Sequence, residues 1–293
     1  MQRLLVLLAG LLLLTLFGCG DTATAENDWA GLNPERVVVI GPSTTETIFK
    51  LGAGDRIVGV SDFCREPKAA KIARVGGQFD PNLERIAALD PDMVITQGDN
   101  QSLRDLCSRL KIPFLSFKTD SVDSWLDEVR QLGELFEFDR ADQYAVDFRQ
   151  DFHKYFNIYR EYNPKVAVLI GRNGVDGMIA VGGGSFLNEL LTAAGGKNVF
   201  GSNSEAYFNL SQEALLNAAP EVLIDLTIPT DSDPQKVASP SNEQALQDFG
   251  AAFPTLPAVQ NKKVFVLNDD FIFLPGPRML QTVHAFHNCV FSD

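Results

Sequence analysis

Few side chains in this sequence are of the types that carry covalent or metal chemistry. The only thiols and imidazoles belong to Cys19, Cys64, Cys107, Cys289, His153, His284 and His287. The cysteines have no Cys-x-x-Cys spacing and suit neither a zinc site nor an iron–sulfur cluster. His284 and His287 lack a third histidine or a carboxylate cluster nearby, so we predict a packed terminal helix there. Ser43 has no histidine close to it, which argues against nucleophilic hydrolysis. We predict no enzyme, no metal site and no cofactor.

Aromatic and polar side chains gather instead in the loops that follow predicted strands. Ligands of open α/β sheets bind outside the carboxyl ends of the strands, so these loops are the candidate binding site. In the first half of the chain they contain Pro42, Ser43, Thr44, Phe63, Arg65, Gly77, Gln78, Phe79, Gly98 and Asp99. In the second half they contain Arg172, Gly183, Gly184, Ser185, Tyr207, Phe208 and the loop Asn268–Phe271 with Asp270.

The elements that must position these loops alternate between strand and helix in two series. Strands are predicted at Arg36–Ile40, Ile57–Val60, Met93–Thr96, Phe114–Phe117, Val166–Ile170, Val222–Leu226 and Val264–Leu267. Helices are predicted at Thr44–Leu51, Leu83–Leu89, Ser102–Leu110, Phe186–Ala194 and Gln212–Ala218. This alternation is typical of βα units on a parallel sheet. We predict an α/β protein with two comparable lobes, each built on a parallel central sheet, and a ligand cleft between them.

An internal repeat supports two duplicated lobes. The segment Glu84–Ile95 matches Glu213–Ile224 in the form E-x-[IL]-x4-P-[DE]-x-[VL]-I. In each copy a helix begins with a glutamate and a proline ends it before a buried strand. A second, weaker repeat pairs Glu46 and Gly52 with Glu189 and Gly195, which have the same spacing in the two halves. The alternative is that the match reflects no duplication, because any boundary at which a proline separates a helix from a strand has a similar sequence.

One long helix is predicted between the two series. An apolar stripe with a period of 3.6 residues starts after Asp139 and stops at Asn163-Pro164. Its members are Ala141, Tyr144, Ala145, Phe148, Phe152, Tyr155, Phe156 and Tyr159. We interpret the stripe as core packing rather than a cofactor site. From Asp139 to Tyr162 the helix would run about 36 Å, long enough to brace both lobes and to permit only modest closure.

Composition limits the partners. The chain has 25 Lys and Arg against 38 Asp and Glu, a formal net charge of −13, so nucleic acid is excluded as a partner. The glycine run Gly182–Gly184 before Ser185 could cradle a phosphate, but no Lys-Ser/Thr follows it, and a tight turn is the preferred interpretation. Cys64, Cys107 and Cys289 form no disulfide framework; one pair could form, and the sequence does not choose it.

The N-terminus has the pattern of an export signal. Arg3 precedes the apolar run Leu4–Leu16, and the run ends in Phe17-Gly18-Cys19. The run is too short for a permanent membrane span. Its end resembles a bacterial lipoprotein signal, which implies cleavage before Cys19 and acylation of its thiol. The alternative is simple secretion, because Phe17 is bulkier than the residue that such signals usually have there. The small and polar residues that follow suit a flexible tether outside the fold.

Several motifs in order resemble one known family. They are Val37–Glu46, Leu51–Val60, Val75–Glu84, Gly195–Asn198 and Leu274–Arg278. They are similar to the helical-backbone, or class III, periplasmic substrate-binding proteins of ABC importers, which serve cobalamin, ferric-siderophore and haem uptake. The resemblance extends from Arg36 to the C-terminus. The loops Ser61–Pro67 and Phe79–Asn82 are most similar to the cobalamin-binding branch.

The resemblance implies a receptor without chemistry of its own, which binds a corrinoid and delivers it to a permease. Aromatic faces would cover the flat macrocycle and polar side chains would bond its amides. If Arg65 and Arg172 point inward, they favour an anionic ferric chelate. If they pair with Glu66 and Asp176, the cleft is nearly neutral and suits a corrinoid. A ferric-siderophore or haem receptor is the alternative within the family; an exported metal-chelate oxidoreductase or chaperone is the alternative from another class.

The resemblance also implies partners and a location. Glutamates at the positions of Glu84 and Glu213 would meet arginine pockets on the two permease subunits, although each could simply stabilise its own helix. The expected partners are the ligand, the permease dimer with its ATPase subunits, and the membrane through the lipid on Cys19. The expected location is the periplasm or cell surface. The predicted layout is a signal peptide at 1–18, a tether at 19–35, lobes at 36–137 and 164–293, and the linking helix at 138–163.

Overall fold

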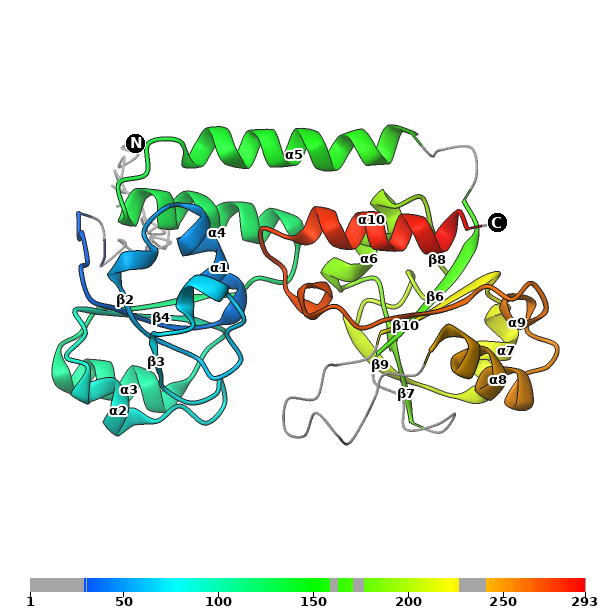
Figure 1. Cartoon of the computed structure of the whole chain (residues 1–293), viewed down its shortest axis with the longest axis horizontal. Helices are drawn as coiled ribbons and strands as arrows, with labels where there is room; N and C mark the ends of the chain where they lie inside the picture. Colours follow the sequence, from blue (N-terminus) through cyan, green and yellow to red (C-terminus); the bar gives the residue numbers. More distant parts are fainter. Residues whose placement is uncertain (1–28, 30, 159–162, 171–176, 227–240, 293) are drawn as a thin grey trace, which may run out of the picture.

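Two α/β lobes lie side by side beneath one long helix. The computed structural model describes residues 29, 31–158, 163–170, 177–226 and 241–292. The long helix is α5 (Ala141–Ile158), and it runs along the top of Figure 1 over both lobes. The predicted helix began at Asp139, but residues 139–140 form a turn, and its predicted end at 159–162 lies outside the described residues.

The first lobe is built on a five-stranded parallel sheet, as predicted. Its strands are β1 (Val37–Ile40), β2 (Ile57–Val60), β3 (Ala73–Arg74), β4 (Met93–Gln97) and β5 (Phe114–Phe117), in the order β3-β2-β1-β4-β5. Strand β1 is a continuous run of Val and Ile because helices cover both faces of the sheet, and all four of its residues are fully buried. The helices are α1 (Pro42–Lys50), α2 (Leu83–Ala88), α3 (Gln101–Leu110) and α4 (Val122–Leu135).

The second lobe has a mixed sheet, which corrects the prediction of a parallel one. Its strands are β6 (Lys165–Ile170), β7 (Met178–Val181), β8 (Lys197–Asn198), β9 (Tyr207–Leu210), β10 (Val222–Leu226) and β11 (Val264–Leu267). The order is β11-β10-β6-β7-β9, with β8 beside the start of β6. Strands β6, β8, β10 and β11 are parallel, whereas β7 runs antiparallel to both β6 and β9. The sequence did not reveal β7 and β9; in β9, exposed residues alternate with more buried ones, so it lacks the continuous apolar run of a strand buried on both faces.

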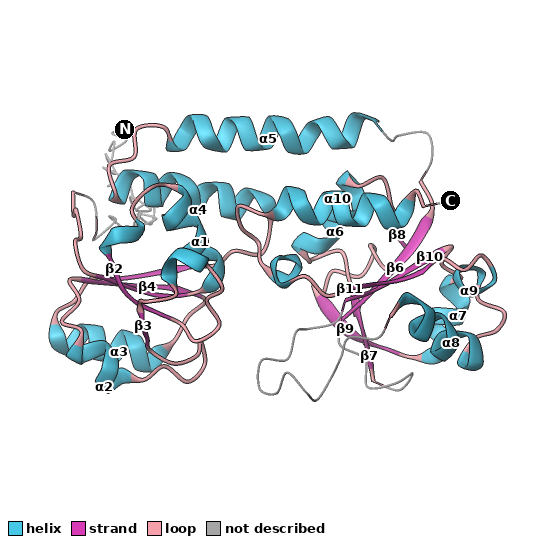
Figure 2. Cartoon of the chain, in the orientation of Figure 1, coloured by secondary structure: helices cyan, strands magenta, loops and turns pink. Residues whose placement is uncertain are grey.

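Helices cover the second sheet on both sides (Figure 2). They are α6 (Phe186–Ala193), α7 (Gln212–Ala218), α8 (Asn242–Ala252), α9 (Pro257–Gln260) and α10 (Met279–Val290). The glycine run before α6 forms a tight turn, as predicted from the sequence. Glycine is needed there because a Cβ at Gly182, Gly183 or Gly184 would clash with backbone carbonyls of residues 201–205. Among the described residues, no helix is long and apolar enough to cross a membrane.

The stripe of the long helix is core packing, as predicted. Ala145, Phe148 and Phe152 are buried against the helices below α5. The Trp125 ring on α4 is 4.6 Å from the Phe148 ring, edge to face. Helix α5 packs against α4 of the first lobe and α6 of the second, so it braces both. The side chains of Phe156 and Tyr159, also assigned to the stripe, lie outside those described.

The internal repeat appears in the geometry of corresponding helices. Helices α2 and α7 begin after the caps Asn82 and Ser211, whose side-chain oxygens accept hydrogen bonds from backbone N–H groups at 2.9 and 3.1 Å. Helices α1 and α6 both end at a glycine with φ +87°, Gly52 and Gly195. Only a residue without a side chain adopts this conformation freely, as the sequence predicted for helix C-caps.

The folded part begins earlier than predicted. Trp29 is 6% exposed and packs into the core of the first lobe, although it was assigned to the tether. The backbone N–H groups of Glu35 and Arg36 donate to the Asp92 carboxylate at 2.8 and 3.0 Å. Any tether therefore ends before Trp29. The signal peptide and Cys19 lie outside the described residues.

The remaining thiols and imidazoles have structural roles. Cys64, Cys107 and Cys289 are all buried and free. Burial raises the pKa of Cys107 to about 11 and that of Cys289 to about 12. His284 meets the hydroxyl of Tyr155 on α5, and the His287 ring lies 4.6 Å from the Phe291 ring. These contacts match the predicted packed terminal helix.

Candidate ligand-binding site

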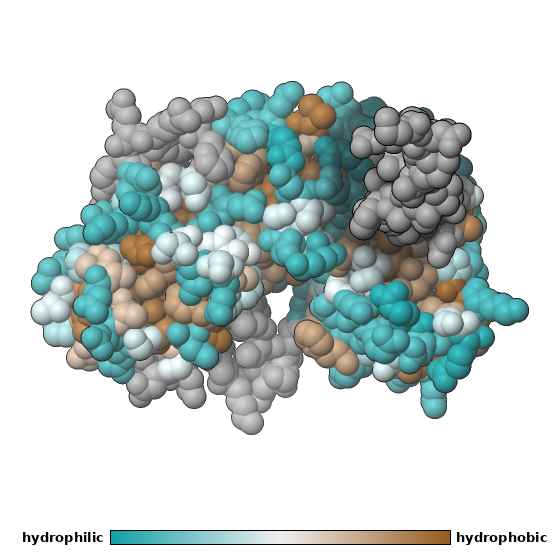
Figure 3. Space-filling model, turned by 180° about the vertical axis from the view of Figure 1, so that it is seen from behind, coloured by the Kyte–Doolittle hydropathy of each residue, from teal (hydrophilic) through white to brown (hydrophobic). Residues whose placement is uncertain are grey.

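A cleft of about 450 Å³ lies between the two lobes. Seen from behind, the lobes are separated by a gap below the bracing helices (Figure 3). The first lobe lines the cleft with Pro42, Ser61, Phe63, Gln78, Gln97, Gly98, Phe117, Lys118, Thr119 and Asp120. The second lobe and its last crossing segment contribute Gly184, Ser185, Phe186, Ala206, Tyr207, Phe273, Leu274 and Pro275.

The position of the cleft follows from the topology of the first sheet. The ends of β2, β4 and β5 lead directly into Ser61, Gly98 and Lys118. Carboxyl ends of parallel strands share one edge of the sheet, so loops distant in sequence converge there. The second lobe adds the turn before α6 and the start of β9.

Phe63, Gln78 and Tyr207, which were predicted to contact ligand, line the cleft. Phe63 is 57% exposed and Tyr207 is 45% exposed, so an aromatic side chain from each lobe faces solvent in the cleft. The Tyr207 hydroxyl accepts a hydrogen bond from Ser185 Oγ at 3.2 Å, and burial raises the pKa of Tyr207. Gln78 donates through Nε2 to the backbone carbonyl of Gln97. Of the other loop residues expected there, Pro42, Gly98, Gly184 and Ser185 line the cleft, whereas Gly77, Asp99, Gly183, Asn268, Asp269 and Phe271 do not.

Three further predicted residues of the first lobe do not line the cleft. Ser43 is fully buried and donates to the backbone carbonyl of Pro275, so it joins the lobes beneath the cleft. Thr44 is also fully buried. Phe79 is 92% exposed and lies outside the cleft lining.

Two further predicted residues lie in a neighbouring cavity, and one packs into a core. Arg65 and Asp270 line a separate space of about 670 Å³ together with Glu66. Arg65 therefore does not point into the cleft, while Arg172 and Asp176 lie outside the described residues. Phe208 alternates with Tyr207 along β9 and faces the other side of the sheet, where its ring is 5.6 Å from that of Phe200.

Sequence reasoning missed several lining residues. Lys118, Thr119 and Asp120 follow β5. They would have been predicted if the loop after this strand had been included, as the loops after other strands were. Phe273 and Pro275 were missed because they do not directly follow a strand: Phe273 ends a short 3-10 helix at Asp270–Phe273, and Pro275 lies just after it. Ser61 lies in the cleft with its hydroxyl buried and without a hydrogen-bond partner among the described residues.

The charges among the described lining residues balance. Lys118 Nζ is 2.9 Å from Asp120 Oδ2. Their hydrogen bond raises the pKa of Lys118 and lowers the pKa of Asp120, so both stay charged at neutral pH. Apart from this pair, the described lining is aromatic, aliphatic or neutral polar. No cluster of three or more potential metal ligands occurs in the described part of the chain.

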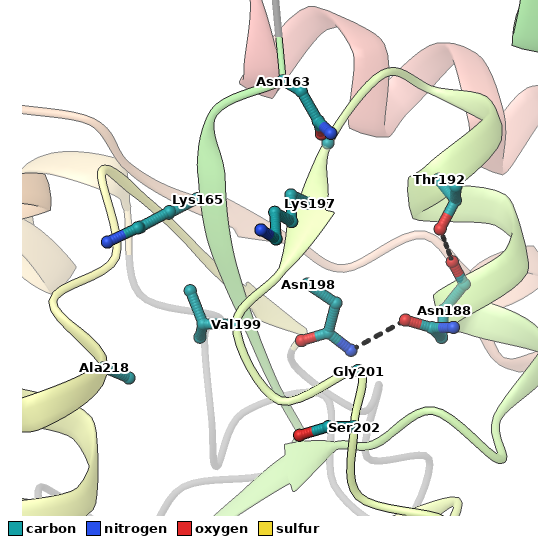
Figure 4. A pocket seen from close by; sticks show the side chains of 11 residues that line it. Asn163, Lys165, Asn188, Thr192, Lys197, Asn198, Val199, Gly201, Ser202 and Ala218 are labelled. Atoms are coloured by element: carbon teal, nitrogen blue, oxygen red, sulfur yellow. Dashed lines mark hydrogen bonds between the residues drawn. The ribbon is translucent and has the colours of Figure 1, made fainter.

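Another cavity of about 570 Å³ lies wholly within the second lobe (Figure 4). Lys165 and Lys197 are paired across the starts of β6 and β8, and Asn198 donates to Asn188 at 3.0 Å. This cavity lies at the amino ends of β6 and β8, away from the strand ends at which ligands of such sheets bind. The cleft between the lobes is therefore the candidate site.

Comparison with known proteins places the chain among binding proteins. The family model described as "Periplasmic binding protein" matches residues 37–271. The vitamin B12-binding protein of Yersinia pestis (strain Pestoides F) is 30% identical over 252 residues, covering 84% of this chain and 82% of the relative. That of Vibrio parahaemolyticus is 29% identical over 258 residues, covering 85% and 86%.

Solved structures share the fold. The periplasmic vitamin B12 binding protein of Vibrio cholerae has a TM-score of 0.71 at 24% identity, covering 88% of this chain and 97% of that one. The periplasmic heme binding protein of the same organism has a TM-score of 0.75 at 18% identity, covering 87% and 98%. Proteins with different ligands therefore share this architecture.

Proposed function

Because the chain belongs to the periplasmic binding protein family, we propose that it captures a corrinoid in the cleft between its lobes and delivers it to an ABC importer. The observation that carries the ligand class is the balanced charge of the cleft. Lys118 and Asp120 neutralise each other, and the described remainder of the lining is aromatic, aliphatic or neutral polar. Such a surface suits a large neutral ring with amide side groups. The named function of the Yersinia and Vibrio relatives supports the same class.

Haem is the second candidate, and one residue favours it. Haem iron requires an axial ligand from the protein, and Tyr207 is an exposed tyrosine inside the cleft. Two features count against it. The Tyr207 hydroxyl already bonds to Ser185, and the raised pKa of Tyr207 disfavours the phenolate that binds iron. The propionates of haem would also need cationic partners, and Lys118 is already paired.

Calorimetric titration with cyanocobalamin, dicyanocobinamide, haem and a ferric siderophore tests the proposal. We expect sub-micromolar binding of a corrinoid and weak or no binding of the other two. Two exposed phenylalanines give a matched pair of variants, since Phe63 lines the cleft and Phe79 does not. Phe63→Ala should weaken corrinoid binding about tenfold, whereas Phe79→Ala should leave it unchanged. Tight binding of haem or a siderophore, with no corrinoid binding, would overturn the assignment.

Delivery to the importer would use Glu84 and Glu213. Both are exposed second residues of their helices, α2 and α7. Asn82 and Ser211 already supply the capping oxygens of these helices, so the glutamates are not needed as caps. Two exposed carboxylates at equivalent positions of the two lobes suit a permease with two similar subunits.

A matched control exists for the docking test. Glu243 is likewise the exposed second residue of a capped helix, α8, but it lies outside the repeat. In the reconstituted importer, Glu84→Ala with Glu213→Ala should abolish ligand-stimulated ATPase activity while ligand affinity stays unchanged. Glu243→Ala should do neither. Normal transport by the double variant would mean that docking uses another surface.

The anchor proposed for this protein is a lipid on Cys19. Nine residues lie between Cys19 and the buried Trp29, so the folded part would be held within roughly 35 Å of the membrane. This places the protein at the periplasmic or outer surface of a cell membrane. The mass of the mature protein should begin at Cys19 with added acyl chains, and Cys19→Ser should abolish both the cleavage and the acylation. A mature protein that starts elsewhere would contradict the anchor.

A further inference from the structure

Glu46 and Glu189 occupy equivalent places in the two copies of the internal repeat. Glu46 lies on α1 and Glu189 on α6, at the same distance from the glycines that end these helices. Neither residue lines the ligand cleft. Each carboxylate instead reaches the start of a helix in the opposite lobe.

Glu46 of the first lobe binds the start of α10 in the second. Its side chain is 6% exposed, and its Oε2 accepts a hydrogen bond from Arg278 Nε at 2.9 Å. Arg278 also donates through its second terminal nitrogen to Glu46 Oε1, so the contact is bidentate. Arg278 is the N-cap residue of α10, and Asp270 holds its remaining nitrogen at 3.0 Å. Paired, parallel hydrogen bonds of this kind fix orientation as well as distance.

Glu189 of the second lobe binds the start of α4 in the first. Its Oε2 accepts a hydrogen bond from the backbone N–H of Val122 at 3.1 Å. Val122 is the first residue of α4, where the N–H groups have no partner within the helix. The carboxylate also meets the positive end of the helix dipole.

The two contacts converge on one place. Helices α4 and α10 both begin near the middle of the molecule, beneath α5, and run outward in opposite directions (Figure 1). Their positive ends would repel each other if no negative charge lay between them. The duplicated glutamates supply that charge, each from the lobe opposite to the helix it binds.

We infer that Glu46 and Glu189 are positioning residues that form a reciprocal clamp between the lobes and thereby set the width of the ligand cleft. The segments they hold lead straight into the cleft lining. Thr119 and Asp120 stand just before Val122, and Pro275 stands just before Arg278. Ser43 provides another contact between the lobes, because its hydroxyl donates a hydrogen bond to the backbone carbonyl of Pro275. The effect on ligand rests on the proposed function, whereas the clamp itself does not.

Amide hydrogen exchange of the full-length protein tests the clamp without any ligand. The readout is the exchange rate of peptides that cover the starts of α4 and α10. Glu46→Ala should speed exchange at both helix starts by about tenfold, and Glu189→Ala should do the same, because either loss frees both lobes. Glu46→Gln and Glu189→Gln keep an acceptor oxygen and should restore most of the protection. Glu134→Ala, an exposed glutamate on α4, is the control and should change neither peptide.

The outcomes separate a clamp from two local contacts. If each alanine variant changes only the helix that its own carboxylate touches, the contacts are independent caps and the inference fails. Peptides from α2 and α7 verify that every variant is folded, since these helices lie far from the junction. The double alanine variant should also bind cyanocobalamin about tenfold more weakly than the double glutamine variant. If the wild-type protein binds no corrinoid, the proposed ligand is wrong, while the exchange result still decides the clamp.

Discussion

The buried carboxyl of Glu128 makes the stability of this protein depend on pH in an unusual direction. Glu128 lies on α4 and is 1% exposed. Its Oε2 accepts a hydrogen bond from Thr119 Oγ1 at 2.5 Å, and Oε1 has no hydrogen-bond partner among the described residues. Thr44 lies close enough to lower the pKa slightly, but its hydroxyl does not reach hydrogen-bonding geometry. Burial outweighs both contacts and raises the pKa of Glu128 from 4.5 to about 7.

The magnitude follows from this difference in pKa. In the unfolded chain the carboxyl titrates at its ordinary value, so between about pH 4.5 and 7 the folded state binds more protons than the unfolded state. The free energy of unfolding therefore falls as the pH rises through this window. At about 1.4 kcal/mol per pH unit, the loss from Glu128 alone amounts to about 3 kcal/mol by pH 8. Glu128→Gln removes the charge and keeps the shape, so it should be more stable than the wild type above pH 7.

Urea denaturation at a series of pH values between 4.5 and 8 measures the effect. Relative to the wild type, Glu128→Gln should have its highest free energy of unfolding at pH 8. This advantage should decrease by about 3 kcal/mol as the pH is lowered to 4.5. Glu134→Gln, on the same helix but exposed, should show a constant difference near zero. Parallel profiles for Glu128→Gln and the wild type would refute the reasoning, because they would mean that Glu128 titrates alike in both states.

Three further outcomes are expected. Trp125→Ala should lower the free energy of unfolding by about 4 kcal/mol in urea denaturation, since it empties a fully buried site and leaves Thr47 without its indole donor. Ala219→Gly should raise it by about 1 kcal/mol because Ala219 has φ 45°, whereas Ala218→Gly, inside the preceding helix, should lower it by a similar amount. Saturating ligand should stabilise the protein by about 3 to 4 kcal/mol at roughly a hundred to a thousand times its Kd. It should leave the radius of gyration measured by small-angle scattering almost unchanged, because α5 braces both lobes; a large decrease would mean that the helix bends at a hinge.

The sequence predicted the elements that depend on local pattern. Strands such as Val222–Leu226 are buried on both faces and are mostly apolar in sequence, so their limits agree with the structure. Helix ends were predictable where a glycine or proline stops the helix, as at Gly52 and Gly195. The antiparallel pair β7 and β9 was not, since β9 places a half-exposed Tyr207 next to a Phe208 that packs against the lobe's own core.

The candidate site was predictable only as a set of loops. Topology indicates which loops meet at a sheet edge, but not which side chain on a loop turns inward. Phe63 and Phe79 have the same type and similar loop positions, yet only Phe63 lines the cleft. Ser43 was expected to touch ligand, but the crossing segment at Pro275, far away in sequence, takes its hydroxyl. Contacts between lobes depend on the whole fold, and no local pattern encodes them.

Charge balance distinguishes the possible ligands of this cleft more sharply than its aromatic side chains do. Phe63, Tyr207 and Phe273 could cover a corrin or a porphyrin equally well, since stacking depends on area rather than on charge. An anionic chelate, however, must leave water and find a cation. Among the described lining residues that cation is Lys118, and an anion that binds it must displace Asp120 from a pair that leaves the cleft with no net positive charge. A neutral, amide-bearing ring requires no such exchange and can bind while the ion pair stays intact, which is the physical reason to prefer the corrinoid.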